Sequence, residues 1–158
     1  MNRKQIYWDS DCFLGYLKSE PDKEDLCGRI LEEADAGRVL LVTSALTIAE
    51  VLNLKGKQRI PKESREGVIN LFRNDYIAVR NVTRRVAEFA REYVWNDGIK
   101  PKDAIHVATA LDARLTLLNT FDEGLLKKSG RLGDSEKLII SRPKPPPAQA
   151  LFEFSENT

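Results

Sequence analysis

The apolar and polar residues of this chain are arranged in short apolar runs separated by longer amphipathic stretches. Residues 38–44, RVLLVTS, form a continuous apolar run of strand length, as expected for a strand covered on both faces of a parallel sheet. Residues 22–36 instead place apolar side chains three or four positions apart and stop at Gly37, which indicates a helix. The predicted strands are residues 4–9, 38–44, 76–82, 114–120 and 137–141.

Amphipathic segments fill the intervals between these strands. Ser44 is placed to cap one helix, and Pro101 suits the first position of another. The predicted helices are residues 11–18, 22–36, 45–55, 61–74, 83–97, 101–113 and 122–128. Regular alternation of strands and helices predicts an α/β layered fold with a mostly parallel sheet.

The length of 158 residues corresponds to one ordinary domain with its own core, predicted at residues 1–142. Residues 143–158 form a Pro-rich C-terminal tail, PKPPPAQALFEFSENT preceded by Arg142. One interpretation is an extended, loosely attached tail. The other is that Leu151, Phe152 and Phe154 dock on a partner subunit or on the chain's own surface.

Composition limits the compartment more than the function. The chain is 42% hydrophobic and 31% charged, which is typical of a globular protein, and no apolar run approaches the ~20 residues that span a bilayer. The N-terminus has no apolar segment of a signal peptide, and Cys12 and Cys27 make no disulfide framework. These features predict a cytoplasmic protein with no membrane partner, and the net charge of +1 neither favours nor excludes nucleic acid.

Four acidic residues lie outside the polar helix faces that hold most of the others. Asp9 ends the first strand, Asp103 begins the helix after GIKPK, and Asp122 follows the strand LTLLNT. Glu50 lies among Ile48, Ala49, Val51 and Leu52, where a carboxylate needs a partner. Because the carboxyl ends of parallel strands meet at one edge, the four acids can converge there.

Converged carboxylates repel one another unless a cation neutralises them or some become protonated. Oxygen ligands with little His or Cys nearby suit Mg²⁺ or Mn²⁺ better than Zn²⁺. A helix cap is the structural alternative for each of Asp9, Asp11, Asp103 and Asp122, because each precedes or begins a predicted helix. It is the joint arrangement that favours a metal site over capping.

Four segments together resemble the PIN-domain nucleases, and most of all the toxin-type members called VapC. They are IYWDSDCFLGYL, VTSALTIAEVLN, KPKDAIHVATAL and LLNTFDEGLL, which follow the order and spacing of that family over residues 6 to about 126. The resemblance implies a three-layer α/β/α sandwich and a Mg²⁺- or Mn²⁺-dependent ribonuclease that leaves 5′-phosphate and 3′-hydroxyl ends. It also implies that Asp9, Glu50, Asp103 and Asp122 form the acidic, metal-binding catalytic cluster.

Two further positions are related to this site by the resemblance. Thr120 matches a position where the family often has a hydroxyl that supports the site. Asp11 departs from the family pattern, which usually has Ser or Asn there, so it either supports the cluster or caps the first helix. His106 is one turn after Asp103, and we expect it to be a core or supporting histidine and not a metal ligand.

RNA contacts are predicted in the basic stretch NLKGKQRIPKESR, through Lys55, Lys57, Arg59 and Lys62, although a solvated loop explains the same residues. If the protein is a toxin, the resemblance implies a protein antitoxin as partner, and family members frequently form homodimers. A PIN nuclease of RNA processing, without a toxin role, fits the same residues.

Two other functions compete with the ribonuclease. The segment DSDCF overlaps the D-x-D-x-[TV] opening of haloacid-dehalogenase-like phosphatases, and GDSEK at 133–137 faintly resembles their last acidic motif. That alternative leaves Glu50 and KPKDAIHVATA without a role. A non-catalytic PIN-like binding subunit is the second alternative, although such proteins usually lack part of the acidic cluster.

Overall fold

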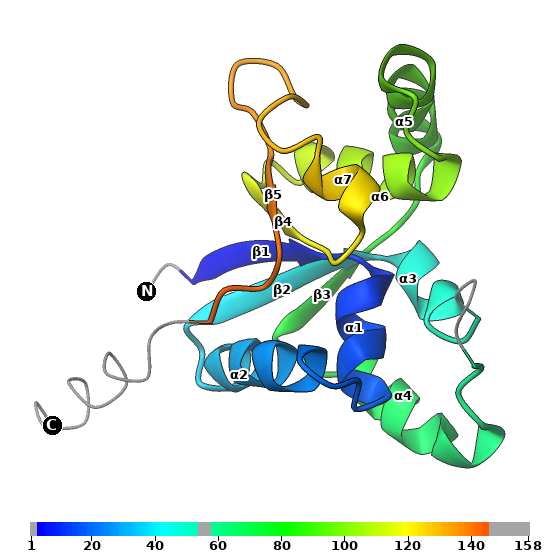
Figure 1. The fold of residues 1–158 in the computed structure, drawn as a ribbon, viewed down its shortest axis with the longest axis vertical. Helices are drawn as coiled ribbons and strands as arrows, with labels where there is room; N and C mark the ends of the chain where they lie inside the picture. Colours follow the sequence, from blue (N-terminus) through cyan, green and yellow to red (C-terminus); the bar gives the residue numbers. More distant parts are fainter. Residues whose placement is uncertain (1–2, 54–57, 146–158) are drawn as a thin grey trace, which may run out of the picture.

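A computed structural model describes residues 3–53 and 58–145. Its centre is a five-stranded sheet in the order β3-β2-β1-β4-β5, and every neighbouring pair is parallel (Figure 1). The strands are β1 (Lys4–Trp8), β2 (Val39–Ser44), β3 (Ile77–Arg80), β4 (Leu117–Asn119) and β5 (Ile139–Ser141). The predicted α/β fold with a parallel sheet is confirmed.

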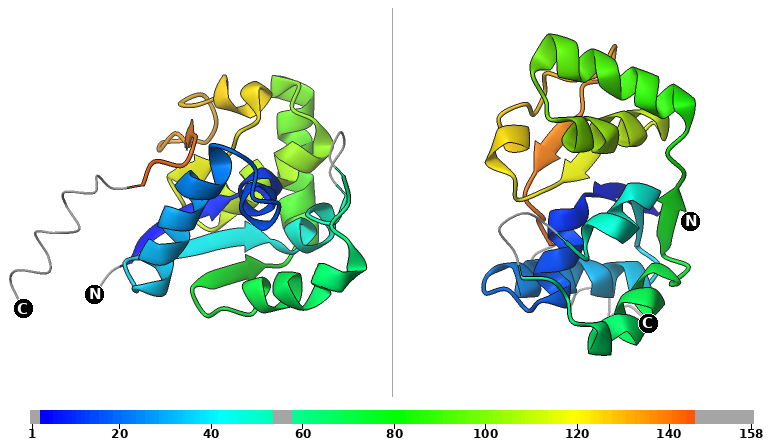
Figure 2. Two further views of the ribbon diagram at one scale, coloured as in Figure 1. Left: turned by 60° about the horizontal axis from the view of Figure 1, so that its bottom comes forward. Right: turned by 90° about the vertical axis from the view of Figure 1, so that its right-hand side faces the viewer.

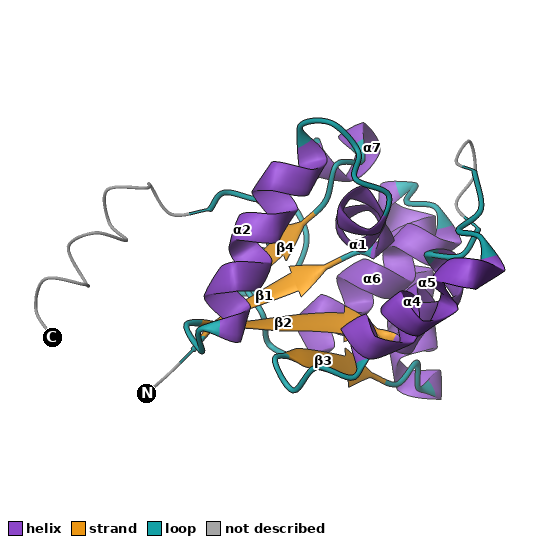
Figure 3. Ribbon diagram, turned by 90° about the horizontal axis from the view of Figure 1, so that it is seen from below, coloured by secondary structure: helices purple, strands orange, loops and turns teal. Residues whose placement is uncertain are grey.

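The strand β1 lies in the middle of the sheet, which decides where the first acidic residue lies. Its register pairs Ile6 with Leu41 of β2, and Trp8 with Asn119 of β4. The strand arrows point the same way in Figure 3, so their carboxyl ends share one edge. Asp9 therefore emerges at the centre of that edge, flanked by the ends of β2 and β4.

Helices cover both faces of the sheet and complete a three-layer α/β/α sandwich (Figures 1 and 2). One layer contains α1 (Ser10–Leu17), α2 (Lys23–Asp35) and α4 (Arg65–Phe72), and the opposite layer contains α5 (Arg84–Asp97) and α6 (Pro101–Asp112). The short helix α3 (Ala45–Glu50) follows β2 directly, and the short helix α7 (Glu123–Leu126) follows β4 after a short loop. A 3₁₀ turn, Lys62–Ser64, precedes α4.

Alternation along β1 divides the apolar side chains between two cores. Tyr7 packs in the core beneath α5 and α6, whereas Ile6 and Trp8 pack beneath α1, α2 and α4. Both Tyr7 and Trp8 are fully buried, and Trp8 Nε1 donates a hydrogen bond of 3.1 Å to Asn119 Oδ1. Trp8 is therefore a core residue, and its burial excludes it as a platform for stacking RNA bases.

Helix α3 is shorter than the predicted helix at 45–55, because it ends at Glu50. After that residue, the amides of Leu52 and Asn53 bond to carbonyls three residues back, at Ala49 and Glu50. This tighter turn ends the α-helical pattern. Glu50 therefore occupies the last helical position, close to the strand edge, and not the middle of a long helix.

Several predictions fall on segments outside the described residues. These are Lys55 and Lys57 of the basic stretch, and Leu151, Phe152 and Phe154 of the tail. Within residues 3–53 and 58–145, no helix has both the length and the apolar character required to cross a membrane.

Candidate active site

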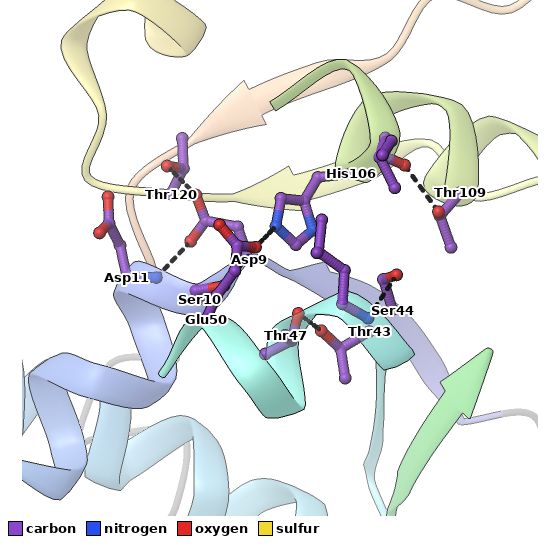
Figure 4. A network of polar contacts seen from close by, with 12 residues as sticks. Asp9, Ser10, Asp11, Thr43, Ser44, Thr47, Glu50, His106, Thr109 and Thr120 are labelled. Atoms are coloured by element: carbon purple, nitrogen blue, oxygen red, sulfur yellow. Dashed lines mark hydrogen bonds and ion pairs between the residues drawn. The ribbon is translucent and has the colours of Figure 1, made fainter. Parts of the chain in front are cut away.

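Asp9 is the innermost of the four predicted acids, with 4% of its surface exposed. It ends β1 and is the N-cap of α1, where its Oδ1 accepts a hydrogen bond of 3.0 Å from the Asp11 amide. Its Oδ2 accepts a bond of 2.5 Å from Thr120 Oγ1 (Figure 4). Each oxygen thus has one donor, which leaves further lone pairs on the carboxylate for a cation.

Thr120 joins two of the acids through its hydroxyl. Its Oγ1 accepts a bond of 3.0 Å from the Asp122 amide while it donates to Asp9. The side chain is fully buried, immediately after β4. The supporting position that the family resemblance implied for Thr120 therefore corresponds to a direct contact with the central carboxylate.

Glu50 reaches the same edge from the end of α3. Its Oε1 lies 2.6 Å from His106 Nε2 and accepts a second bond of 2.9 Å from Ser10 Oγ. His106 is 2% exposed, and its Nδ1 lies 2.6 Å from the hydroxyl of Tyr7. Both of these contacts of Glu50 are made through Oε1.

The chemistry of the groups limits the direction of these bonds. Burial holds the pKa of Tyr7 well above its ordinary value, so its hydroxyl is protonated and able to donate to Nδ1 of His106. The Nε2–H of the imidazole donates to the Glu50 carboxylate, which has no proton of its own to give. His106 is therefore a supporting histidine held between the buried Tyr7 and the partly buried Glu50.

Asp103 and Asp122 form the outer part of the cluster, and both are partly buried. Asp103 lies in the first turn of α6, and Asp122 is the N-cap of α7, where its Oδ2 accepts a bond of 2.9 Å from the Leu125 amide. The two acids line one cavity of about 310 Å³. The capping alternative is thus correct for Asp9 and Asp122, yet it is compatible with their place in the cluster.

The repulsion between the carboxylates is reflected in their pKa values. Burial, followed by the charges of Asp11 and Asp103, raises the pKa of Asp9 to about 7, although His106 and the hydrogen bond from Thr120 partly lower it. Burial, followed by the charge of Asp122, raises the pKa of Asp103 to about 6. These carboxylates are close enough to disfavour each other's ionised form, which is the electrostatic condition that a cation relieves.

Glu50 differs from those two acids. Burial alone would raise its pKa, but the hydrogen bonds from His106 and Ser10, with the charge of Lys102, lower the pKa overall. Glu50 consequently keeps a negative charge more readily than Asp9 or Asp103 does.

The family of the chain follows from comparison with known sequences, because the model of the PIN domain matches residues 6–131. The chain belongs to the PIN domain family. Comparison with curated proteins gives no significant match.

Solved structures with the same fold include a toxin and a toxin–antitoxin complex. The VapC20 toxin of Mycobacterium tuberculosis, described as cleaving the sarcin–ricin loop, has a TM-score of 0.61 at 16% identity, over 74% of this chain and 89% of that one. A toxin–antitoxin complex from Klebsiella pneumoniae has a TM-score of 0.57 at 19% identity, over 89% and 99%. FitAcB from Neisseria gonorrhoeae has a TM-score of 0.50 at 22% identity, over 75% and 88%. These likenesses establish that the fold is that of VapC-type proteins.

The phosphatase alternative is wrong. Membership of the PIN family removes it, and so does the position of GDSEK at 133–137. This segment precedes β5 and lines a cavity with Arg114 and Leu115, which precede β4. It therefore lies at the amino edge of the parallel sheet, whereas Asp9 lies at the carboxyl edge.

Asp11 does not cap the first helix of this PIN domain, because the capping side chain is that of Asp9. Asp11 lies in the first turn of α1, and its charge raises the pKa of both Asp9 and Asp103. Its alternative role beside the acidic cluster therefore stays a prediction. Asp9 is the cap because it has the extended backbone conformation of an N-cap residue at the end of β1.

The predicted RNA-binding residues lie apart from the acids, as far as the structure describes them. Arg59 and Lys62 line a groove between α3 and α4, not the cavity of Asp103 and Asp122. Sequence reasoning also missed three groups at the site, Tyr7, Ser10 and Lys102. Tyr7 resembled an ordinary strand residue, and only its contact with His106 gives it a role here.

The donor set fits Mg²⁺ or Mn²⁺, since the cluster offers carboxylate oxygens whose charges are mutually uncompensated. As arranged in residues 3–53 and 58–145, no three His, Cys, Asp or Glu side chains form a metal-binding group. A cation held by Asp9, Asp103 and Asp122 together would therefore require these carboxylates to lie closer to one another than they do here.

Proposed function

We propose that this PIN domain is a Mg²⁺- or Mn²⁺-dependent endoribonuclease, and that it is the toxin of a toxin–antitoxin pair. The observation that carries the proposal is the gathering of Asp9, Glu50, Asp103 and Asp122 at the carboxyl edge of one parallel sheet, with the pKa of two of them raised. Family membership supports a nuclease, and the fold shared with VapC20 supports a toxin.

Each residue has a distinct task in this proposal. Asp9, Asp103 and Asp122 would hold the cation, and Glu50 would orient the attacking water. When bound, such a cation would supply an activated water and offset charge on the phosphate. Thr120 holds Asp9 in place through its hydroxyl, while His106 and Ser10 hold one oxygen of Glu50.

The decisive variant is Asp103→Asn, which removes one charge without changing the volume. Metal-dependent cleavage of structured RNA should fall at least a hundredfold, and thermal stability should be nearly unchanged or raised, because the substitution relieves repulsion. Wild-type protein with EDTA is the matching control. Undiminished Mn²⁺-dependent cleavage by Asp103→Asn would contradict the assignment.

Two alternatives remain to be separated from the toxin. A non-catalytic binding subunit predicts neither cleavage nor Mn²⁺ binding by calorimetry. A PIN nuclease of RNA processing predicts cleavage without growth arrest when the chain is expressed alone in a bacterium. A toxin predicts growth arrest by wild type and none by Asp103→Asn.

An antitoxin is the partner that this proposal requires, as in the Klebsiella pneumoniae complex. The groove between α3 and α4 suits a partner segment, because it has a volume of about 580 Å³ and contains the half-exposed side chains Ile48 and Leu52. Basic residues also line it, namely Arg59, Lys62, Arg65 and Arg73. An amphipathic helix with an acidic face and an apolar face matches this combination.

The antitoxin can be sought as a small reading frame directly upstream of the gene. Its product should protect cells from the toxin, and Leu52→Glu should weaken the complex in a binding assay. Trp95→Glu is a suitable control, because Trp95 is 70% exposed on α5, away from the groove. A homodimer and a cytoplasmic location also belong to this proposal, and sedimentation would test the former.

A further inference from the structure

The cavity of Asp103 and Asp122 is bounded by positive as well as negative side chains. Lys100 stands at the N-cap of α6, and Lys128 follows the end of α7. Both lysines line the same cavity of about 310 Å³ as the two acids, although Lys100 precedes α6 in the sequence and Lys128 follows α7. This volume is at the lower end of the about 300–1,000 Å³ of small-ligand sites.

Neither lysine is neutralised by the acids beside it. Within the described part of the chain, Lys100 and Lys128 form no ion pair, although Asp97, Asp103 and Asp122 line the same cavity. Lys128 is partly buried, whereas Lys100 is exposed. Positive and negative groups thus share one cavity without pairing.

Such a separation of charge suits a phosphodiester that must approach carboxylates. A wall of acids repels an RNA backbone, and the chain's overall net charge of +1 provides little attraction at a distance. Cations at the rim of the acidic cluster can offset this repulsion and hold phosphates next to the scissile one. Gly124 keeps the space beside Asp122 open, because a Cβ there would lie 3.1 Å from Asp122 Oδ2.

We propose that Lys100 and Lys128 form the phosphate-binding site of this nuclease, holding the RNA backbone beside the carboxylates of the same cavity. The inference rests on the proposed function and makes it more specific, since it names the surface that grips RNA. It places the RNA contacts on α6 and α7 and not on the basic stretch that contains Arg59 and Lys62. The site recognises phosphate charge and is indifferent to base identity.

The experiment compares Lys100→Gln, Lys128→Gln and the double variant with wild type. Mn²⁺-dependent cleavage of a short single-stranded oligoribonucleotide should show an increase in KM of about threefold to tenfold for each single variant. Anisotropy of the same fluorescent oligoribonucleotide, bound to proteins that also carry Asp103→Asn, gives affinity without cleavage. The slope of log affinity against log salt should decrease by about 0.7 for each lysine removed.

Three controls make the result specific. Lys4→Gln removes the same charge at the amino edge of the sheet and should leave KM and the salt slope unchanged. Lys100→Arg and Lys128→Arg should restore binding, because they retain the charge. The pair Arg59→Gln and Lys62→Gln tests the basic stretch.

If the Lys100→Gln, Lys128→Gln double variant has the KM and the salt slope of wild type, the proposed phosphate site is wrong. Metal-dependent cleavage by wild type would in that case still support the proposed nuclease function. The phosphate site would also be overturned if the slope of log affinity against log salt decreased in the Arg59→Gln, Lys62→Gln protein and not in the lysine variants. Absence of any metal-dependent cleavage by wild type would instead contradict the proposed function. In that case, the anisotropy measurement still decides whether the two lysines bind RNA.

Discussion

His106 Nε2 lies 2.6 Å from Glu50 Oε1, and this contact joins a histidine on α6 to a carboxylate at the end of α3 across 56 positions of sequence. The imidazole is held on its other side by Tyr7, so its orientation is defined at both nitrogens. The arrangement resembles the carboxylate–histidine supports of metal sites, although here the carboxylate is the group that is held.

The first prediction concerns this support. Tyr7→Phe should leave the Nδ1 of His106 buried without its hydrogen-bond partner, which costs about 1–3 kcal/mol of unfolding free energy. Freed to turn, the imidazole should hold Glu50 less firmly, and Mn²⁺-dependent cleavage should decrease about tenfold. Chemical denaturation and kcat measurements check the two effects. Full activity in a destabilised Tyr7→Phe protein would show that the contact serves stability alone.

The second prediction concerns the hydroxyl of Thr120. Thr120→Val retains the shape and removes the donor to Asp9, so the pKa of Asp9 should rise further. Affinity for Mn²⁺ should decrease about tenfold to a hundredfold, as for other groups that orient metal ligands. Calorimetric titration measures this decrease. Thr120→Ser should behave almost as wild type, and equal losses in both variants would argue against the hydrogen bond as the cause.

The third prediction is a pH dependence of stability in the absence of metal. The pKa of Asp9 rises from 3.8 to about 7 on folding, so the folded state binds more protons than the unfolded state between those values. The contribution of Asp9 is therefore fully present below about pH 4 and is lost as pH rises through 7. Glu33, whose pKa is lowered by Arg38, changes stability with pH in the opposite sense. The informative quantity is therefore the difference in unfolding free energy between wild type and Asp9→Asn, because both proteins contain Glu33.

Denaturation in EDTA from pH 4 to pH 8 measures that difference. Asp9→Asn should gain stability relative to wild type as pH increases, and Mn²⁺ should stabilise wild type at pH 8 but not the variant. A difference between the two proteins that does not vary with pH would show that the carboxylate is ionised throughout.

The fourth prediction separates stability from activity at Gly124. Alanine is a better helix former than glycine by about 1 kcal/mol, so Gly124→Ala in α7 should not lower stability greatly. Its Cβ would lie 3.1 Å from Asp122 Oδ2 and should displace that carboxylate, so Mn²⁺-dependent cleavage should decrease. The matched control is Gly67→Ala in α4, where a Cβ meets nothing within 4 Å. If both variants keep full activity, the position of Asp122 is not critical.

Local patterns in the sequence were sufficient for much of the fold. The β-branched and aromatic residues within 4–9 predicted a buried strand, and Pro101 predicted the first residue of α6. Both patterns depend on neighbours in the chain, through strand or helix periodicity and the fixed backbone angle of proline. The order of strands and helices then placed Asp9, Asp103 and Asp122 near one sheet edge, because parallel strands share that edge.

Tertiary structure decided the contacts that join distant segments. No local pattern pairs Tyr7 with His106, which are 99 positions apart, or shows that Lys100 and Lys128 line one cavity. It also decided between Asp9 and Asp11 as the cap of α1, since that choice depends on backbone angles at the end of β1. Periodicity specifies which face a side chain occupies, whereas the packing of whole elements specifies which distant groups meet on that face.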